Sequence, residues 1–169
     1  MSHQNDAVDR IAHQWAVERP ELDTGPMSVI GRLHRLAELL DVELRTVFAK
    51  AGLGNGDFDV LASLRRSGAP FSLTPGELSA STMVTSGAVT KRVDRLERKG
   101  LVERTVTEGD RRGREIRLTE AGRALVDEVV VDHWANEDRL LAALDPAERT
   151  QLAGLLRKLL LDVEGPVAD

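Results

Sequence analysis

Basic side chains at helical spacing are the residues of this chain best suited to chemistry with an anionic partner. Residues 86–99 have the periodicity of an amphipathic helix, with the apolar residues Val89, Val93 and Leu96 on one face. The cations Lys91, Arg95 and Arg98 lie on the opposite face of the same helical wheel. A helix with an apolar back and a front rich in hydrogen-bond donors fits the major groove of double-stranded DNA.

A second basic cluster lies at the expected tip of a β-hairpin. Residues 108–114 read Glu-Gly-Asp-Arg-Arg-Gly-Arg, a turn with three arginines between two strands expected at 101–106 and 114–118. An arginine on a narrow loop can enter a minor groove, and Asp110 could hold Arg112 in place by a salt bridge. The alternative for both clusters is a solvated, charged surface, but their occurrence in tandem favours nucleic acid.

The distribution of charge supports this interpretation. The chain has 169 residues and a formal net charge of −5, which by itself argues against a nucleic-acid partner. Residues 85–117, however, contain 10 Lys and Arg against 6 Asp and Glu, a net charge of +4. A basic stretch inside an acidic chain suggests an anionic partner for that stretch.

Several classes of function are disfavoured by what the sequence lacks. There is no cysteine, which excludes disulfides, thiol nucleophiles and cysteine-based metal or redox sites. The four histidines show no pair at metal-ligand spacing, and no phosphate loop, nucleophile elbow or paired inward carboxylates are present. We therefore expect neither an enzyme, nor a cofactor, nor a metal site. No apolar run is long enough to span a bilayer, and residues 1–10 are polar, without the apolar segment of a secretory signal, so we expect a cytoplasmic protein.

Helix signals position these clusters. Apolar periodicity predicts helices near 8–15, 26–51, 57–66, 74–82, 86–99, 119–144 and 146–163. Capping boxes are expected at Thr74, followed by Pro75 and Glu77, and at Asp145. We divide the chain into N-terminal helices (1–54), a DNA-binding lobe (55–118) and C-terminal helices (119–169). The terminal helices have more apolar surface than a small central lobe can cover, which indicates a second copy of the chain.

The stretch 73–125 resembles the winged helix-turn-helix of the MarR family of transcriptional regulators. The similarity lies in Gly-Leu-Val-Glu-Arg at 100–104, Asp-Arg-Arg at 110–112 and Leu-Thr-Glu-Ala-Gly at 118–122. It implies a mainly α fold with a small β-hairpin wing (α+β). It also implies a homodimer whose N- and C-terminal helices interlock, bound to a pseudo-palindromic operator in double-stranded DNA. The usual role in this family is repression relieved by a small ligand. We expect such a protein to be cytoplasmic and associated with the nucleoid.

The residues that we expect to contact DNA combine the cations with small and hydroxyl-bearing side chains of the two helices. They are Thr74, Ser86, Gly87, Thr90, Lys91, Arg95, Arg98, Asp110, Arg111, Arg112 and Arg114.

Four further residues resemble the ligand set of urate-responsive, PecS-like members of the family: Trp15, Asp59, Arg92 and Arg104. The resemblance implies a pocket in which both arginines hold an anion, Asp59 contacts its polar edge and Trp15 packs against it. Each residue also has a structural interpretation, because Trp15 completes an apolar stripe, Asp59 suits a helix N-terminus and the arginines could form salt bridges. Urate, a citrate- or aconitate-like carboxylate, and no ligand at all remain open.

Overall fold

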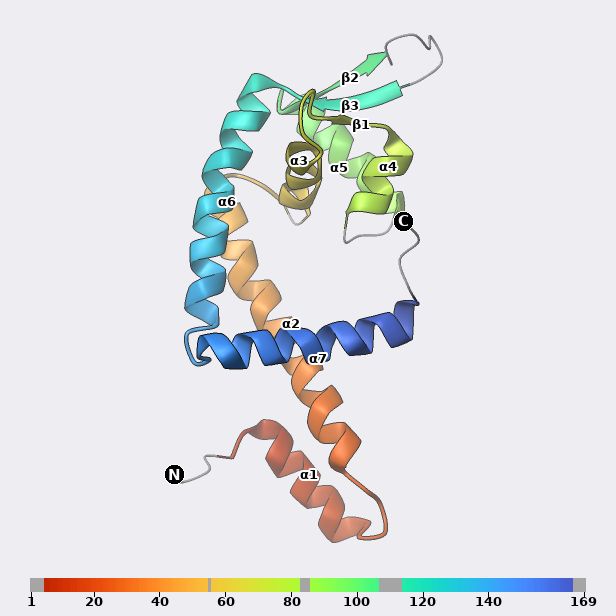
Figure 1. The fold of residues 1–169 in the computed structure, drawn as a ribbon, viewed down its shortest axis with the longest axis vertical. Helices are drawn as coiled ribbons and strands as arrows, with labels where there is room; N and C mark the ends of the chain where they lie inside the picture. The colour runs from red at the N-terminus through yellow and green to blue at the C-terminus, as the bar shows by residue number, and fades with distance from the viewer. Residues whose placement is uncertain (1–4, 55, 83–85, 107–113, 166–169) are drawn as a thin grey trace. The chain divides into compact units, whose positions relative to one another are not determined.

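The structure, a computed structural model, describes residues 5–54, 56–82, 86–106 and 114–165. It contains two compact units, residues 1–46 and 47–169. The elements in chain order are α1 (Ala7–Glu18), α2 (Gly25–Lys50), α3 (Asp57–Arg66), β1 (Ser72–Leu73), α4 (Pro75–Ser81), α5 (Ser86–Arg98), β2 (Val102–Val106), β3 (Arg114–Leu118), α6 (Glu120–Leu140) and α7 (Pro146–Glu164) (Figure 1). The expected mainly α fold with a small sheet is confirmed.

In the first unit, α1 packs on α2 through an ion-pair network and one buried apolar contact. Asp6 forms a capping box with Asp9, whose backbone N–H lowers the pKa of the Asp6 carboxyl. Arg32 of α2 donates to both carboxylates, from Nε to Asp6 Oδ2 at 2.9 Å and from Nη2 to Asp9 Oδ1 at 2.6 Å. Val8 is buried against Gly31, where even a Cβ would lie 3.3 Å from the valine side chain.

The second unit has an aliphatic core formed by α3, α4, α5, α6 and the sheet. Leu61 and Leu64 of α3 and Leu96 of α5 are fully buried in it. The sheet is antiparallel with strand order β1-β3-β2, and Val102 pairs with Leu118 while Val106 pairs with Arg114. The predicted hairpin is therefore present, and the extended piece before α4 adds a third strand to its other side.

A glycine contact sets α6 against the start of β2. Thr119 is the N-cap of α6: its Oγ1 accepts from the backbone N–H of Gly122 and donates to the carbonyl of Gly100 at 2.7 Å. A Cβ at Gly122 would lie 1.9 Å from the carbonyl oxygen of Leu101. Only a glycine lets the helix approach this closely.

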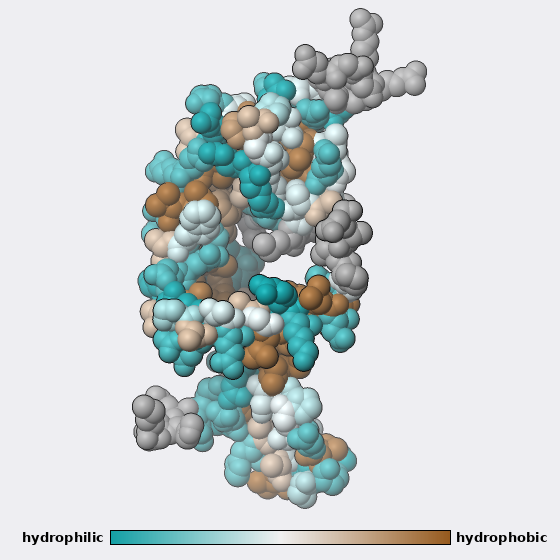
Figure 2. Space-filling model, in the orientation of Figure 1, coloured by the Kyte–Doolittle hydropathy of each residue, from teal (hydrophilic) through white to brown (hydrophobic). Residues whose placement is uncertain are grey.

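Part of α6 packs into the core of the second unit. Val126 and Val129 belong to the same buried cluster as Leu61 and Leu64 of α3. In α7, by contrast, no residue is buried. Hydrophobic surface is visible over α7 in Figure 2. Its exposed apolar residues include Leu152, Leu155, Leu159, Leu160, Leu161 and Val163.

Candidate nucleic-acid interface

The helix pair α4–α5 has the polarity that its sequence predicts. Val89, Val93 and Leu96 of α5 are buried in the core, while Thr90, Lys91 and Arg98 are exposed. Ser86 and Gly87 are the first residues of α5. The outer face of α5 therefore presents two cations and a hydroxyl to solvent, as a helix that enters a major groove requires.

The start of α4 is stabilised by the predicted capping box. Thr74 Oγ1 accepts from the backbone N–H of Glu77 at 3.3 Å, and the Glu77 carboxylate accepts from the backbone N–H of Thr74 at 2.8 Å. The hydrogen bond from the Thr74 backbone is the largest cause that lowers the pKa of Glu77. The Thr74 hydroxyl also donates to Glu77 at 2.8 Å, so a contact from this hydroxyl to DNA would compete with the cap.

Two strands contribute arginines beside this helix pair. Arg114, the first residue of β3, is exposed. Arg104 of β2 forms salt bridges with Asp94 and Glu97 of α5, and its hydrogen bond to Asp94 raises the pKa of the guanidinium. Asp110, Arg111 and Arg112, expected at the hairpin tip, lie outside the residues that the structure describes.

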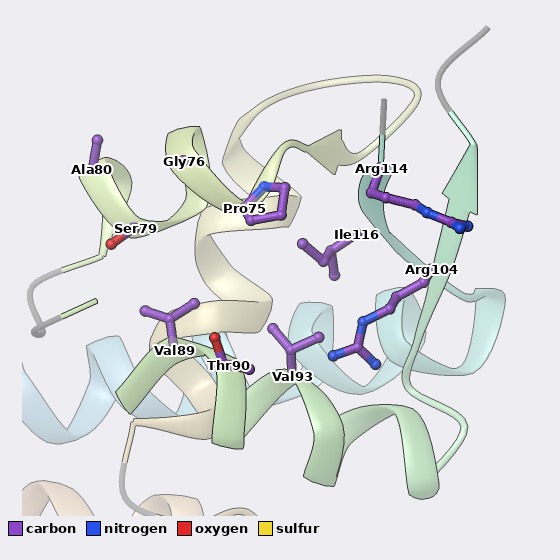
Figure 3. A pocket seen from close by; sticks show the side chains of 10 residues that line it. All are labelled: Pro75, Gly76, Ser79, Ala80, Val89, Thr90, Val93, Arg104, Arg114 and Ile116. Atoms are coloured by element: carbon purple, nitrogen blue, oxygen red, sulfur yellow. The ribbon is translucent and has the colours of Figure 1, made fainter. Parts of the chain in front are cut away.

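A cavity of about 860 Å³ lies between α4, α5 and the strands. Val89, Thr90 and Val93 line it from α5, and Ile116 lines it from β3 (Figure 3). Figure 3 also shows Arg104 reaching from β2 toward α5 at one end of the cavity. Its walls are thus largely apolar, with arginines at the strand side.

Arg95 does not extend freely from the outer face of α5 as we expected. Its Nε lies 3.0 Å from both carboxylate oxygens of Asp57, and its Nη2 also donates to Oδ1. Asp57 is completely buried and accepts a further hydrogen bond from the backbone N–H of Gly54 at 2.6 Å. A buried carboxylate is stable only when charge and hydrogen bonds compensate it, so Arg95 has a structural partner before any DNA arrives.

Arg92 lies on the same flank of α5. Its Nη1 is buried and has no hydrogen-bond partner among the residues that the structure describes. The guanidinium lies directly over Gly56, where a Cβ would be 2.2 Å from Cζ. Gly56 has a φ of 74°, a left-handed conformation that itself favours glycine. A half-buried cation with an unused donor is a position at which an anion could bind.

The residues expected to bind a ligand have different surroundings within the second unit. Arg92 contacts the loop before α3, whereas Arg104 pairs with Asp94 and Glu97 and lines the cavity beside α5. Asp59 is half-buried in the first turn of α3. Trp15 belongs to the first unit and is 48% exposed.

Sequence reasoning missed Asp57, the most buried charged residue among those described. The expectation centred on Asp59, two residues later, because Asp59 belongs to the resemblance. Asp57 is separated from Arg95 by 38 positions, and no local pattern indicates the pair. The one available signal is that Asp57 follows a glycine-rich loop at the start of a helix, where a carboxylate is also stabilised by the helix dipole.

Among the described residues, no group of three or more acidic or histidine side chains could hold a metal ion. The side chain of His133 is 13% exposed and packs against Phe48 and Phe58, with ring centroids 5.3 and 4.9 Å away. None of the helices in the described ranges combines the length and the apolar character that spanning a bilayer requires.

Comparison with known proteins identifies the family. Residues 51–113 match the family model described as MarR family. The chain is 43% identical to the HTH-type transcriptional regulator PecS of Dickeya dadantii over 152 residues, which cover 90% of this chain and 92% of PecS.

Two solved structures agree with this result. A mutant of MarR from E. coli, complexed with operator DNA, is 30% identical with a TM-score of 0.70, covering 81% of this chain and 97% of that one. BpsR of Bordetella bronchiseptica, whose DNA binding is described as regulated by 6-hydroxynicotinic acid, is 27% identical with a TM-score of 0.68 and covers 78% and 93%. Fold, helix polarity and relatives together show that this chain belongs to the MarR family and is a DNA-binding transcriptional regulator rather than an enzyme.

Proposed function

We propose that this protein is a repressor that binds a pseudo-palindromic operator as a homodimer and is released by a small anion, with urate as the first candidate. The observation that carries the ligand part is the buried, unpartnered Nη1 of Arg92. The DNA part is supported by the exposed cations of α5 and by the relative that was complexed with operator DNA.

On the DNA side, the proposal assigns different roles to the cations. Lys91 meets base edges or phosphates of the major groove from the outer face of α5. Arg98 and Arg114, both exposed, contribute phosphate contacts. Arg112 enters the minor groove from the hairpin tip, with Arg111 beside it.

Apolar surface on the terminal helices supports the homodimer. Ile11 and Trp15 of α1, and Leu155 and Leu160 of α7, are between 46% and 56% exposed. Such side chains are usually covered when they form stripes along whole helices, because their contact with water is unfavourable. In a two-fold symmetric dimer the two recognition helices meet half-sites about one DNA turn apart.

The ligand part rests on the chemistry of Arg92. A guanidinium binds planar anions such as carboxylates or urate through paired hydrogen bonds, and Nη1 has that capacity unused. Arg92 and Lys91 belong to the same helix, α5. An anion that binds Arg92 would therefore affect the DNA-binding face through one rigid element. The relative BpsR, regulated by 6-hydroxynicotinic acid, supports a small aromatic acid as an effector class.

The test is binding of the full-length protein to its own upstream intergenic DNA, followed by fluorescence anisotropy. The complex is titrated with urate and, in parallel, with citrate. Release by urate alone supports a purine effector, and release by citrate alone transfers the proposal to carboxylates. A tight complex that neither compound affects contradicts the ligand part and leaves a ligand-independent regulator.

Two arginine variants locate the ligand. Arg92→Ala should bind DNA but require at least about tenfold more urate for release, since it loses a charge-assisted contact. Arg104→Ala tests whether the ligand binds instead in the cavity between α4, α5 and the sheet, which Arg104 lines. Arg157→Ala, which removes one exposed cation of α7, is the matched control for the change in net charge. A normal urate response in Arg92→Ala removes Arg92 from the site.

A separate variant tests the minor-groove contact that we propose for Arg112. Arg112→Ala should weaken operator binding by more than about tenfold, the magnitude of a specific arginine contact. Unchanged operator affinity in this variant would exclude the minor-groove role.

A further inference from the structure

One flank of the recognition helix α5 holds the loop before α3 with three successive cations. Arg92, Arg95 and Lys99 are spaced at i, i+3 and i+7, which places them on the same side of the helix. Lys99 Nζ donates to the carbonyl of Gly52, Arg95 binds Asp57, and Arg92 lies over Gly56. The loop joins the end of α2 to the start of α3.

The Asp57–Arg95 pair is the strongest of these contacts. Both Asp57 oxygens lie 3.0 Å from Arg95 Nε, and Nη2 adds another hydrogen bond to Oδ1. The planar guanidinium can satisfy the carboxylate in this way only at one distance and one orientation of α5 relative to α3. Gly54 packs closely against this ion pair: a Cβ at Gly54 would lie 3.0 Å from Asp57 Oδ2 and 3.3 Å from Arg95 Nη2.

The carboxylate cannot adapt if the helix moves. Asp57 has no exposed surface, so water cannot replace Arg95 as its partner without opening the core around α3. Arg95, with 38% of its side chain exposed, is the accessible half of the pair. Rotation or displacement of α5 would therefore leave a buried charge with one backbone hydrogen bond.

We infer that Asp57 is a positioning residue for DNA binding: through Arg95 it sets the rotation of α5 that presents Lys91 and Arg98 to the operator. Arg95 is used inside the protein and makes no contact to DNA. This inference rests on the proposed placement of the outer face of α5 against the operator, and it replaces our expectation that Arg95 contacts DNA.

A double-mutant cycle separates positioning from direct contact. Asp57→Asn, Arg95→Gln and the double variant are compared for operator affinity over a range of salt concentrations. Positioning predicts that each single variant loses about tenfold in affinity and that the double variant is no weaker than either one, because both remove the same interaction. The salt dependence should stay that of the wild type, since no phosphate contact is lost.

A direct contact by Arg95 predicts a different pattern. Arg95→Gln would then weaken binding, with a salt slope smaller by about 0.9 if the contact is to a phosphate, or with relaxed preference at one base pair if it is to a base. Asp57→Asn, which frees the arginine, would leave affinity unchanged or improve it. Either result overturns the inference.

Arg95→Lys keeps the inference testable if Asp57→Asn fails to fold. Lysine retains the charge but not the planar fork, so a phosphate contact tolerates the change whereas the pair with Asp57 does not. Affinity close to wild type in Arg95→Lys contradicts the positioning role, and a loss equal to that of Arg95→Gln supports it. Circular dichroism and sedimentation show that each variant compared is folded and has the wild-type oligomeric state.

Lys91→Gln tests the underlying placement of α5. This variant should bind the operator more weakly. If Lys91 contacts a phosphate, the slope of the salt dependence should also become smaller by about 0.9. If Lys91→Gln binds like the wild type while the Asp57–Arg95 cycle shows its expected non-additivity, the proposed DNA contact of Lys91 is wrong and the positioning role stands. If Lys91→Gln weakens binding and the two pair variants do not, the positioning role is wrong and the DNA face stands.

Discussion

Gly56→Ala should weaken the ligand response while changing the stability of the protein little more than a comparable glycine substitution nearby. Gly56 has a φ of 74°, and an alanine in the left-handed region costs about 1–2 kcal/mol. The new Cβ would lie 2.2 Å from Arg92 Cζ, whereas ordinary contacts begin at 3.4 Å. The guanidinium must therefore move by about 1.2 Å or leave its site.

Gly52→Ala is the matched control. Gly52 lies in the same loop with a φ of 67°, and a Cβ there would meet nothing within 4 Å. Its carbonyl accepts from Lys99, and a side chain at residue 52 does not remove that acceptor. Both variants thus carry the same backbone cost, and only Gly56→Ala displaces Arg92. Since Nη1 of Arg92 makes no hydrogen bond, we expect their unfolding free energies to agree within about 0.5 kcal/mol.

Urea unfolding measures the stability difference, and urate titration of the operator complex measures the response. We expect Gly52→Ala to respond like the wild type and Gly56→Ala to need at least about tenfold more urate, the loss that displacement of one charge-assisted contact predicts. An equal urate response in the two variants would refute the reasoning that Arg92, held over Gly56, binds the ligand. A large stability difference between them would show that Arg92 is mainly structural.

Three further predictions concern stability. Gly122→Ala should destabilise the protein by about 2 kcal/mol or more in urea unfolding, because its Cβ would lie 1.9 Å from the Leu101 carbonyl oxygen. Gly154→Ala, where a Cβ on α7 meets nothing within 4 Å, should instead stabilise it by up to about 1 kcal/mol. The pKa of Glu77 is lowered by its hydrogen bond to Thr74, so the wild type should be more stable than Glu77→Gln above pH 4.5, and this advantage should disappear as the pH falls through the lowered pKa. Thermal unfolding should shift to higher temperature with protein concentration, and a midpoint independent of concentration would contradict the homodimer.

Local signals were sufficient to predict most of the secondary structure. Thr74 and Asp145 are N-caps where the sequence predicted them, because a cap depends on hydrogen bonds within three or four residues. The apolar face of α5 is also buried as predicted, since a helix has a fixed angle per residue. The family, and with it the fold, followed from motifs inside one continuous stretch of chain.

None of these local signals predicted which carboxylates the arginines contact. On the wheel, Arg95 was assigned to the outer face together with Lys91, but its guanidinium binds Asp57. The resemblance implied that Arg104 holds an anion together with Arg92, and it gave no indication of the salt bridges that Arg104 forms with Asp94 and Glu97. Spacing determines the angle at which a side chain leaves its helix, and the end point of an arginine depends on which carboxylate lies within its reach.

The sequence by itself therefore determined the helices, their polarity, the family and the kind of partner. The tertiary structure decided which cations of α5 are available to an external anion and which are already paired. The physical reason is that a buried carboxylate such as Asp57 must be compensated where it lies, and its position relative to α5 is set by the packing of the core between them.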